Sequence, residues 1–301
     1  MKKKRIKKSN VVLTLILLPG LLYFIVNNYM PMFGIFMAFK RVNFMKGILA
    51  SPWCGFDNFK FLFSTDDAWV ITRNTVLYNV AFIVLGTVCA ITIAILMNEI
   101  GKHIAAKFVQ SALLFPYLVS MVIVAYVVYA FLNSESGFIN NTILNGNGPQ
   151  WYSEAKYWPV ILIIVFLWKG AGYQSIVYMA GIAGIDKSIY EAARVDGASK
   201  LRQIFSITLP MLKPTIIIMA LMAVGKIFNS DFGLFYQVPM NSGALYSTTQ
   251  TIDTYVYRGL LELNDVGMSS AASVYQSIVG FLLVIVSNTI VRKVDSDNAL
   301  F

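Results

Sequence analysis

Hydrophobic residues along this chain gather in long continuous runs instead of alternating with polar residues. A helix needs roughly 20 apolar residues to cross the hydrocarbon core of a bilayer, whereas a membrane β-barrel needs an alternating pattern. The pattern therefore predicts an all-α, polytopic membrane protein with six transmembrane helices. The runs are Val11 to Phe39, Val76 to Met97, Phe108 to Leu132, Tyr157 to Ala180, Pro214 to Tyr236 and Ala271 to Val291.

The composition agrees with this class, because 57% of the 301 residues are hydrophobic and only 13% are charged. That is too little polar surface to cover a water-soluble globule. A basic segment at residues 1–10 precedes the first run, as in a signal peptide, but no clear small-residue cleavage site follows. We expect the run to be retained as the first helix, and residues 11–301 to form a single transmembrane domain.

The basic residues lie at the ends of the apolar runs, where they orient membrane helices, and not in a patch typical of nucleic-acid binding. Placing the N-terminus inside puts the main basic clusters in internal segments. We therefore predict cytoplasmic N- and C-termini and no nucleic-acid partner, despite a formal net charge of +9. The internal clusters are Lys2 to Lys8, Lys102 with Lys107, Lys187 to Lys213, and Arg292 with Lys293.

Enzymatic chemistry finds little support in this sequence. Cys54 and Cys89 are the only cysteines and His103 is the only histidine, which disfavours a disulfide framework, a zinc site and a Ser/His/Asp triad. The sequence also lacks a GxxxxGKS/T phosphate loop, an HExxH motif and a GxSxG motif. We expect no catalytic residue, no metal site and no cofactor on this chain.

The longest internal polar segment is residues 185–214. Its pattern predicts a short helical hairpin on the cytoplasmic side, which could dock in a groove of a partner protein. Pro210 and Pro214 lack an amide donor, so they are expected to interrupt the helix and to set the angle at which the chain re-enters the membrane. The predicted parts are a helix at Ser188 to Val195, a turn at Asp196-Gly197 and a helix at Ser199 to Leu209.

Three motifs in this segment are Glu191-Ala192-Ala193, Asp196-Gly197-Ala198 and Ile207-Thr208-Leu209-Pro210. In order and spacing they resemble the signature of permease subunits of binding-protein-dependent ABC importers. The stretches Ile252 to Leu260 and Ser287 to Lys293 are similar to the carbohydrate class of that family, in particular to permeases for complex oligosaccharides and polysaccharide fragments. One departure is Ile185-Asp186, where many relatives have Ile-Pro. We expect it to change how the hairpin begins more than whether it forms.

The resemblance implies that the hairpin is a coupling helix that inserts into a separate ATP-binding subunit. It also implies a bacterial cytoplasmic membrane, a second permease subunit that is a different chain, two ATPase subunits that bind ATP and Mg, and an extracytoplasmic binding protein that delivers a carbohydrate. A hairpin with a purely structural role is the alternative. The residues assigned to ATPase coupling are Glu191, Ala192, Ala193, Asp196, Gly197, Ala198, Leu209 and Pro210.

Polar residues inside apolar runs are costly in lipid and usually face a bundle interior or a water-filled path. Lys169 and Lys226 lie roughly midway through the bilayer by residue count. In the fifth run, polar residues recur at helical spacing from Lys226 to Gln237, which predicts one polar stripe along a path for sugar hydroxyls. Hydrogen bonds between helices are the alternative role. The candidates for the solute path are Lys169, Tyr173, Lys226, Asn229, Ser230, Gln237 and Tyr275.

An ion-coupled secondary transporter is the main alternative to an ATP-driven importer. It would need an acidic relay in the membrane, and apart from Asp231 acidic residues are nearly absent from the apolar runs. A membrane-embedded enzyme has less support still, because no catalytic motif is present. We predict alternating access, in which ATP-driven closure of the ATPase subunits moves the coupling hairpins, opens the path towards the binding protein and closes the inner gate.

Overall fold

The computed structural model describes residues 8–100 and 104–294. Residues 1–7 of the predicted basic N-terminal segment, Lys102 and His103 lie outside the described residues, as do residues 295–301. The described part of the chain is helical and contains no β-strand, which confirms the all-α class. Its contacts divide it into two compact units, one comprising the residues up to Thr65 with Val256–Val274, and the other comprising Asp66–Tyr255 with the residues from Tyr275 onward.

The first unit contains the N-terminal apolar run, which is helical from Leu13 to Phe39 and long enough to cross a membrane. A loop at residues 40–56 follows this run. The run is built from α1 (Lys8–Phe24), a π-helical turn (Ile25–Tyr29), α2 (Met30–Met32) and a 3-10 helix (Phe33–Phe39), and the loop leads into α3 (Asp57–Ser64). The predicted first helix is therefore present.

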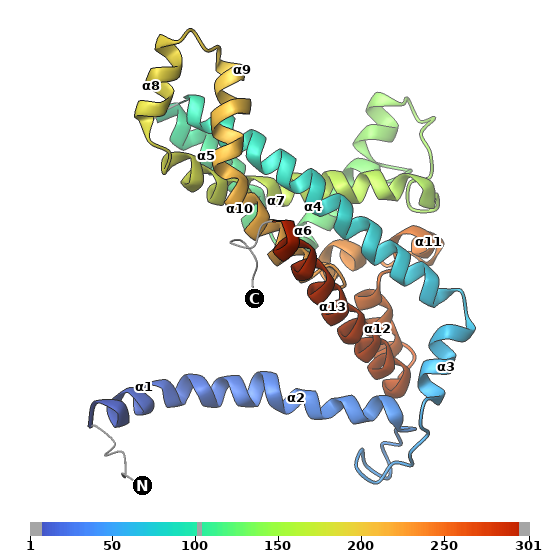
Figure 1. Ribbon diagram of the computed structural model, residues 1–301. Helices are drawn as coiled ribbons and strands as arrows, with labels where there is room; N and C mark the ends of the chain where they lie inside the picture. Colours follow the sequence, from blue (N-terminus) through green and yellow to red (C-terminus); the bar gives the residue numbers. More distant parts are fainter. Residues whose placement is uncertain (1–7, 101–103, 295–301) are drawn as a thin grey trace. The chain divides into compact units, whose positions relative to one another are not determined.

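The second unit is organised around α4 (Asp67–Ile100), which packs along α7 (Trp158–Ala183) (Figure 1). Ala90 and Ala94 of α4 are fully buried, and their small side chains allow close packing of the helices. A second buried cluster, centred on Trp158, is largely aromatic and aliphatic. The remaining helices are α5 (Ile104–Leu118), α6 (Met121–Leu132), α8 (Lys187–Val195), α9 (Lys200–Gln203), α10 (Leu209–Val224), α11 (Tyr246–Thr249), α12 (Ile252–Leu261) and α13 (Val266–Val294).

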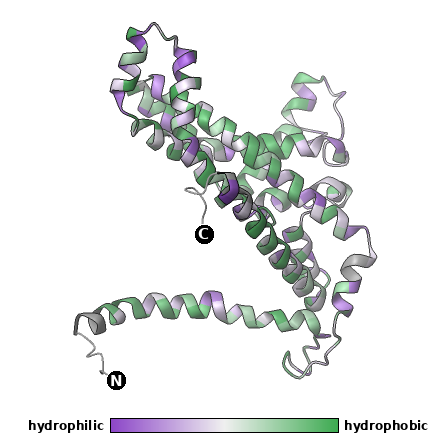
Figure 2. Cartoon of the chain, in the orientation of Figure 1, coloured by the Kyte–Doolittle hydropathy of each residue, from purple (hydrophilic) through white to green (hydrophobic). Residues whose placement is uncertain are grey.

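Five helical segments in the described part of the chain are long and apolar enough to span a membrane, and their apolar character is evident in Figure 2. The sixth predicted span is present only as the pair α5 and α6, which is bent by 97°. The predicted run Phe108–Leu132 is therefore helical, but it consists of two helices that meet at a sharp bend. Pro116 removes an amide donor near the end of α5, and Ser120 starts a new helix by accepting a hydrogen bond from the Ile123 amide.

The fifth span also differs from its predicted bounds of 214–236. It runs without a break from Lys200 to Val224, so Pro210 and Pro214 do not interrupt it. A π-helical turn, Ile204–Thr208, ends two residues before Pro210 and widens the backbone where the proline ring would otherwise clash with the preceding turn. The helix ends instead at Gly225, a residue of low helix propensity.

Candidate functional site

The predicted hairpin is formed by α8 and by α9 with the π-helical turn that continues it, and its two arms lie side by side (Figure 1). Asp186 caps the start of α8, because its carboxylate accepts a hydrogen bond of 2.9 Å from the Ser188 amide. That bond holds the pKa of Asp186 below its ordinary value. The Ile185-Asp186 departure thus supplies an N-cap, and the hairpin forms as expected.

The turn between the arms is closed by two backbone hydrogen bonds. The amide of Gly197 donates to the carbonyl of Arg194 over 3.0 Å, and the amide of Ala198 donates to the carbonyl of Ala193 over 2.8 Å. These two bonds are those of a Schellman helix end, which needs a left-handed residue, and Gly197 supplies it with a φ of 75°. Three motif residues, Ala193, Gly197 and Ala198, therefore act through their backbones.

Side chains then hold the two arms together. The hydroxyl of Tyr190 on α8 lies 2.9 Å from that of Thr208, the residue before Leu209. Within the second arm and the turn before it, the side-chain amide of Gln203 donates to the carbonyl of Ala198 over 2.9 Å. Leu209 and Pro210 begin α10, so these two assigned residues stand at the base of the hairpin and not in its turn.

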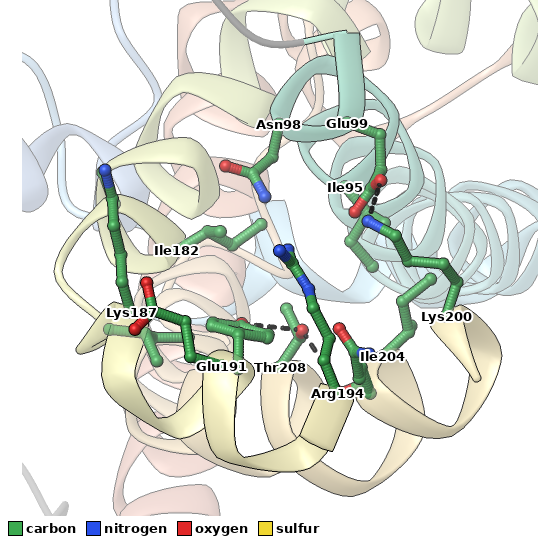
Figure 3. Close-up of a pocket in the computed structure, with 14 residues that line it drawn as sticks. Ile95, Asn98, Glu99, Ile182, Lys187, Glu191, Arg194, Lys200, Ile204 and Thr208 are labelled. Carbon is green, nitrogen blue, oxygen red and sulfur yellow. Dashed lines mark hydrogen bonds and ion pairs between the residues drawn. The ribbon is translucent and has the colours of Figure 1, made fainter. Parts of the chain in front are cut away.

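One face of α8 lines a polar cavity of about 320 Å³ that is also lined by the ends of α4 and α7 (Figure 3). Glu191 lies on this face with Lys187 and Arg194, and Lys200 pairs with Glu99 on the far wall. The other assigned motif residues, Ala192 and Asp196 among them, are not part of the cavity lining. Large apolar side chains are exposed nearby, namely Val195 at 88%, Leu201 at 67% and Phe205 at 67%.

The segment that follows α10 is not helical, and side chains from two other helices bond its carbonyls. Asn79 on α4 donates to the carbonyls of Ile227 and Asn229, over 3.0 and 3.1 Å. Gln276 on α13 donates to the carbonyl of Phe228 over 2.6 Å. Non-helical backbone at membrane depth is tolerated when protein groups satisfy it in this way. The predicted stripe from Lys226 to Gln237 is therefore wrong, because these residues share no continuous helix.

An acidic residue clamps the same segment. The carboxylate of Asp253 accepts hydrogen bonds from the amide of Ser230 over 2.6 Å and from its hydroxyl over 2.7 Å. Gln276 donates to the other carboxylate oxygen over 3.1 Å, and the Ser230 hydroxyl also lies 2.7 Å from that of Thr251. Ser230, a predicted path residue, is thus engaged in a structural network.

Two predicted path residues, Lys226 and Asn229, line a cavity of about 250 Å³ in the second unit. Lys226 is exposed and makes no ion pair with any of the residues that the structure describes. Sequence reasoning missed most of the other walls, although Asn79, Ile83 and Thr87 recur every four residues and could have been found as one helix face. The cavity is also lined by Phe82, Phe166, Gln174, Tyr178, Met219 and Ala223, with the Phe82 and Phe166 rings stacked at 3.9 Å.

Lys169 occupies a different place, at the bend between α5 and α6. Its ammonium group donates to the carbonyls of Pro116 and Tyr117 over 3.3 and 3.1 Å, and also to that of Val119. Tyr173, one turn further along α7, stacks on the Tyr117 ring with centroids 4.0 Å apart. Lys169 therefore makes hydrogen bonds to another helix, the alternative role expected for it, and Tyr173 packs against the same bend.

The last two candidates lie apart from the cavity. The Tyr275 hydroxyl lies 3.1 Å from that of Thr72, and its ring packs edge-on against Phe228. Gln237 is the last residue of a π-helical turn, Gly233–Gln237. Of the seven candidates, only Lys226 and Asn229 share the lining of one cavity.

Comparison with known proteins places this geometry in a family. The family model for the inner membrane component of binding-protein-dependent transport systems matches residues 83–296. This range includes the whole hairpin, Lys169 and Lys226. The chain belongs to this family. It is a permease subunit of the ABC importer type, and its multi-pass membrane character agrees with that assignment.

Relatives of this permease extend over nearly the whole chain. Protein LplB of Bacillus subtilis is 32% identical over 95% of this chain and 90% of its own length. The polygalacturonan/rhamnogalacturonan transport system permease protein YteP of the same organism is 31% identical, over 93% of this chain and 88% of its own. A crystal structure of a bacterial ABC transporter involved in the import of the acidic polysaccharide alginate matches with a TM-score of 0.86 and 31% identity, covering 96% of this chain and 97% of that chain.

Proposed function

We propose that this permease forms the membrane path of an ATP-driven importer for oligosaccharides or polysaccharide fragments, in particular carboxylated ones. The observation that carries the substrate class is the cavity that holds Lys226 and Asn229. Its walls offer side-chain amides for hydroxyl groups, aromatic side chains and one ammonium group without an acidic partner among the described residues. The names of the relatives support a saccharide, and one solved relative imports an acidic polysaccharide.

Energy would enter through the hairpin. Its backbone-closed turn is rigid, and the exposed apolar side chains of Val195, Leu201 and Phe205 suit burial in a groove of a separate ATPase. In this proposal the eight assigned motif residues shape or line the contact between the hairpin and the ATPase. Glu191 contributes its charge to this contact, and Gly197 contributes the positive φ that the turn requires. ATP and Mg are bound by the partner ATPase subunits and not by this chain.

The remaining partners follow the same proposal. A second, different permease chain completes the path, two ATPase subunits supply the energy, and an extracytoplasmic binding protein delivers the saccharide. A solved relative in complex with an alginate pentasaccharide-bound periplasmic protein, with a TM-score of 0.85 and 30% identity over 95% of this chain and 96% of that chain, supports a binding-protein partner. The basic clusters at Lys187–Lys213 and at Arg292 and Lys293 support cytoplasmic N- and C-termini in a bacterial cytoplasmic membrane.

Uptake by the purified complex in proteoliposomes tests this function. We expect accumulation of a uronic-acid oligosaccharide that requires internal ATP and the binding protein. A Lys226→Gln variant should lose about tenfold in uptake efficiency for the carboxylated sugar while retaining more activity towards a neutral oligosaccharide of equal length. Uptake that persists without ATP and follows an ion gradient would instead establish an ion-coupled secondary transporter. An equal loss of uptake for the carboxylated and the neutral sugar would show that Lys226 does not select for the carboxylate.

A further inference from the structure

The loop at residues 40–56 buries two of its polar side chains, those of Lys40 and Ser51. Lys40 is only 5% exposed, and its ammonium group donates to the carbonyls of Ile48 and Leu49 and lies over the Trp53 ring. Ser51 is 3% exposed, and its hydroxyl accepts a hydrogen bond from the Asn43 amide over 2.9 Å. These buried bonds give the loop a defined shape.

The base of the loop is tied to the end of the first span. The amide of Cys54 donates to the carbonyl of Phe39 over 2.9 Å, and the Asn58 side chain donates to the carbonyls of Ala38 and Lys40 over 2.8 and 3.0 Å. Because the apolar run ends at Phe39, the loop starts where the chain leaves the hydrocarbon core. Its tip therefore stays close to the membrane surface.

The apolar side chains of the loop point the opposite way. Met45 is 97% exposed and Leu49 is 81% exposed, with further exposed rings at Phe44, Trp53 and Phe56. A loop that buries Lys40 and Ser51 and presents such apolar side chains to solvent is costly in water. Lys46 is exposed beside this tip, and Arg41, which pairs with Asp57 over 3.9 Å, is exposed at the base of the loop, so basic residues flank the apolar tip as a charged rim.

We propose that this loop inserts its Phe44, Met45 and Leu49 side chains into the membrane leaflet in which the first span ends, with Arg41 and Lys46 against anionic lipid headgroups. Apolar tips with basic flanks bind interfaces of this kind, burying their side chains roughly 5–10 Å below the headgroups. The loop would act as a stop that fixes the depth of the first span. This assignment is independent of the transported substrate.

Fluorescence quenching on the complete complex tests the proposal. An environment-sensitive fluorophore is attached to Met45→Cys, or to Leu49→Cys as a second position, in a Cys54→Ser, Cys89→Ser background, and the complex is reconstituted in phosphatidylethanolamine and phosphatidylglycerol vesicles. Lys60→Cys on α3, whose side chain is 79% exposed, is the matched control. We expect lipids spin-labelled on the acyl chain to quench the loop positions about threefold more than the control, and iodide to do the reverse.

Two other quenching patterns would overturn the proposal. Strong iodide quenching at Met45 and Leu49 would place the tip in water. Protection from both quenchers would mean that a protein surface, such as the partner permease, covers it. The charged rim is tested by omitting phosphatidylglycerol. If lipid quenching is then lost, and if Lys46→Gln removes this dependence on phosphatidylglycerol, the contact with anionic headgroups is supported. If lipid quenching does not depend on anionic lipid, the headgroup contact is overturned.

Discussion

The turn of the hairpin and the break after α10 both lie at an end of the Lys200–Val224 span, but different interactions hold their backbones. In the hairpin the amides of Gly197 and Ala198 bond carbonyls three and five residues earlier, within the same helix. At the break, the carbonyls of Ile227 and Phe228 are bonded by side chains that lie 148 and 48 residues away in the sequence. The hairpin can therefore move as a rigid body, whereas the break can keep its shape only while α4, α10 and α13 stay in place.

The largest effect is expected from Asp253→Ala. This change leaves the Ser230 amide without its acceptor and removes one partner of Gln276, at a cost of about 3 kcal/mol. Thermal unfolding of the purified complex and uptake should both suffer, because the cavity residues Lys226 and Asn229 flank the clamp. Asp231→Ala is the matched control, since the Asp231 carboxylate accepts a local hydrogen bond from the Leu234 amide and its loss should cost about 1 kcal/mol. Equal effects of the two changes would contradict a long-range clamp.

A somewhat smaller effect, about 2 kcal/mol, is expected from Lys169→Met. The carbonyls at the bend between α5 and α6 lose their common donor, which they cannot replace from lipid. Lys169→Arg keeps the donors and should restore most of the stability. If Lys169 instead contacts solute, Lys169→Met would raise the substrate concentration needed for half-maximal uptake without lowering the unfolding temperature.

The contrast also explains what the sequence could predict. The hairpin follows from neighbouring residues, since the Asp196-Gly197 pair and the capping Asp186 act within one or two turns. The end of α10 depends on Asn79 and Gln276, whose distance from Phe228 along the chain hides their role. A continuous apolar run cannot show that its helix stops at Gly225 when the carbonyls beyond find partners on other helices.

The bend at Ser120 is an intermediate case. Pro116 followed four residues later by a good N-cap is a local signal for a break, but the run from Phe108 to Leu132 is apolar enough to conceal it. The partner of the bend, Lys169, was recognised as costly in the membrane, yet its role required the fold. Burial cost identifies a lysine that needs partners, and only the structure shows whether they are carbonyls or solute.

Gly197→Val should have a smaller effect on stability and a specific effect on coupling. Nothing lies within 4 Å of an added Cβ, so the cost is backbone strain of about 1 to 2 kcal/mol at a positive φ. Gly146 has a φ of 80° and the same open surroundings but lies in another loop, so Gly146→Val is a matched control. Both variants should unfold at similarly lowered temperatures, but only Gly197→Val should reduce the sugar imported per ATP hydrolysed. An equal ratio of sugar imported to ATP hydrolysed in the two variants would show that the turn has no role in energy transfer.

The smallest effect is expected for the ion pair between Lys200 on the hairpin and Glu99 on α4. Both side chains are substantially exposed, at 58% and 43%, so their coupling energy should be about 0.5 kcal/mol or less and should fall with added salt. A double-mutant cycle with Glu99→Gln and Lys200→Gln, read out by stability and by uptake at low and high salt, measures it. In the proposed transport cycle, a weak ion pair between Lys200 and Glu99 would let the hairpin tilt against α4 as a rigid body. A coupling energy several times larger would mean that the hairpin is anchored to α4, and the proposed rigid-body movement would then have to include both.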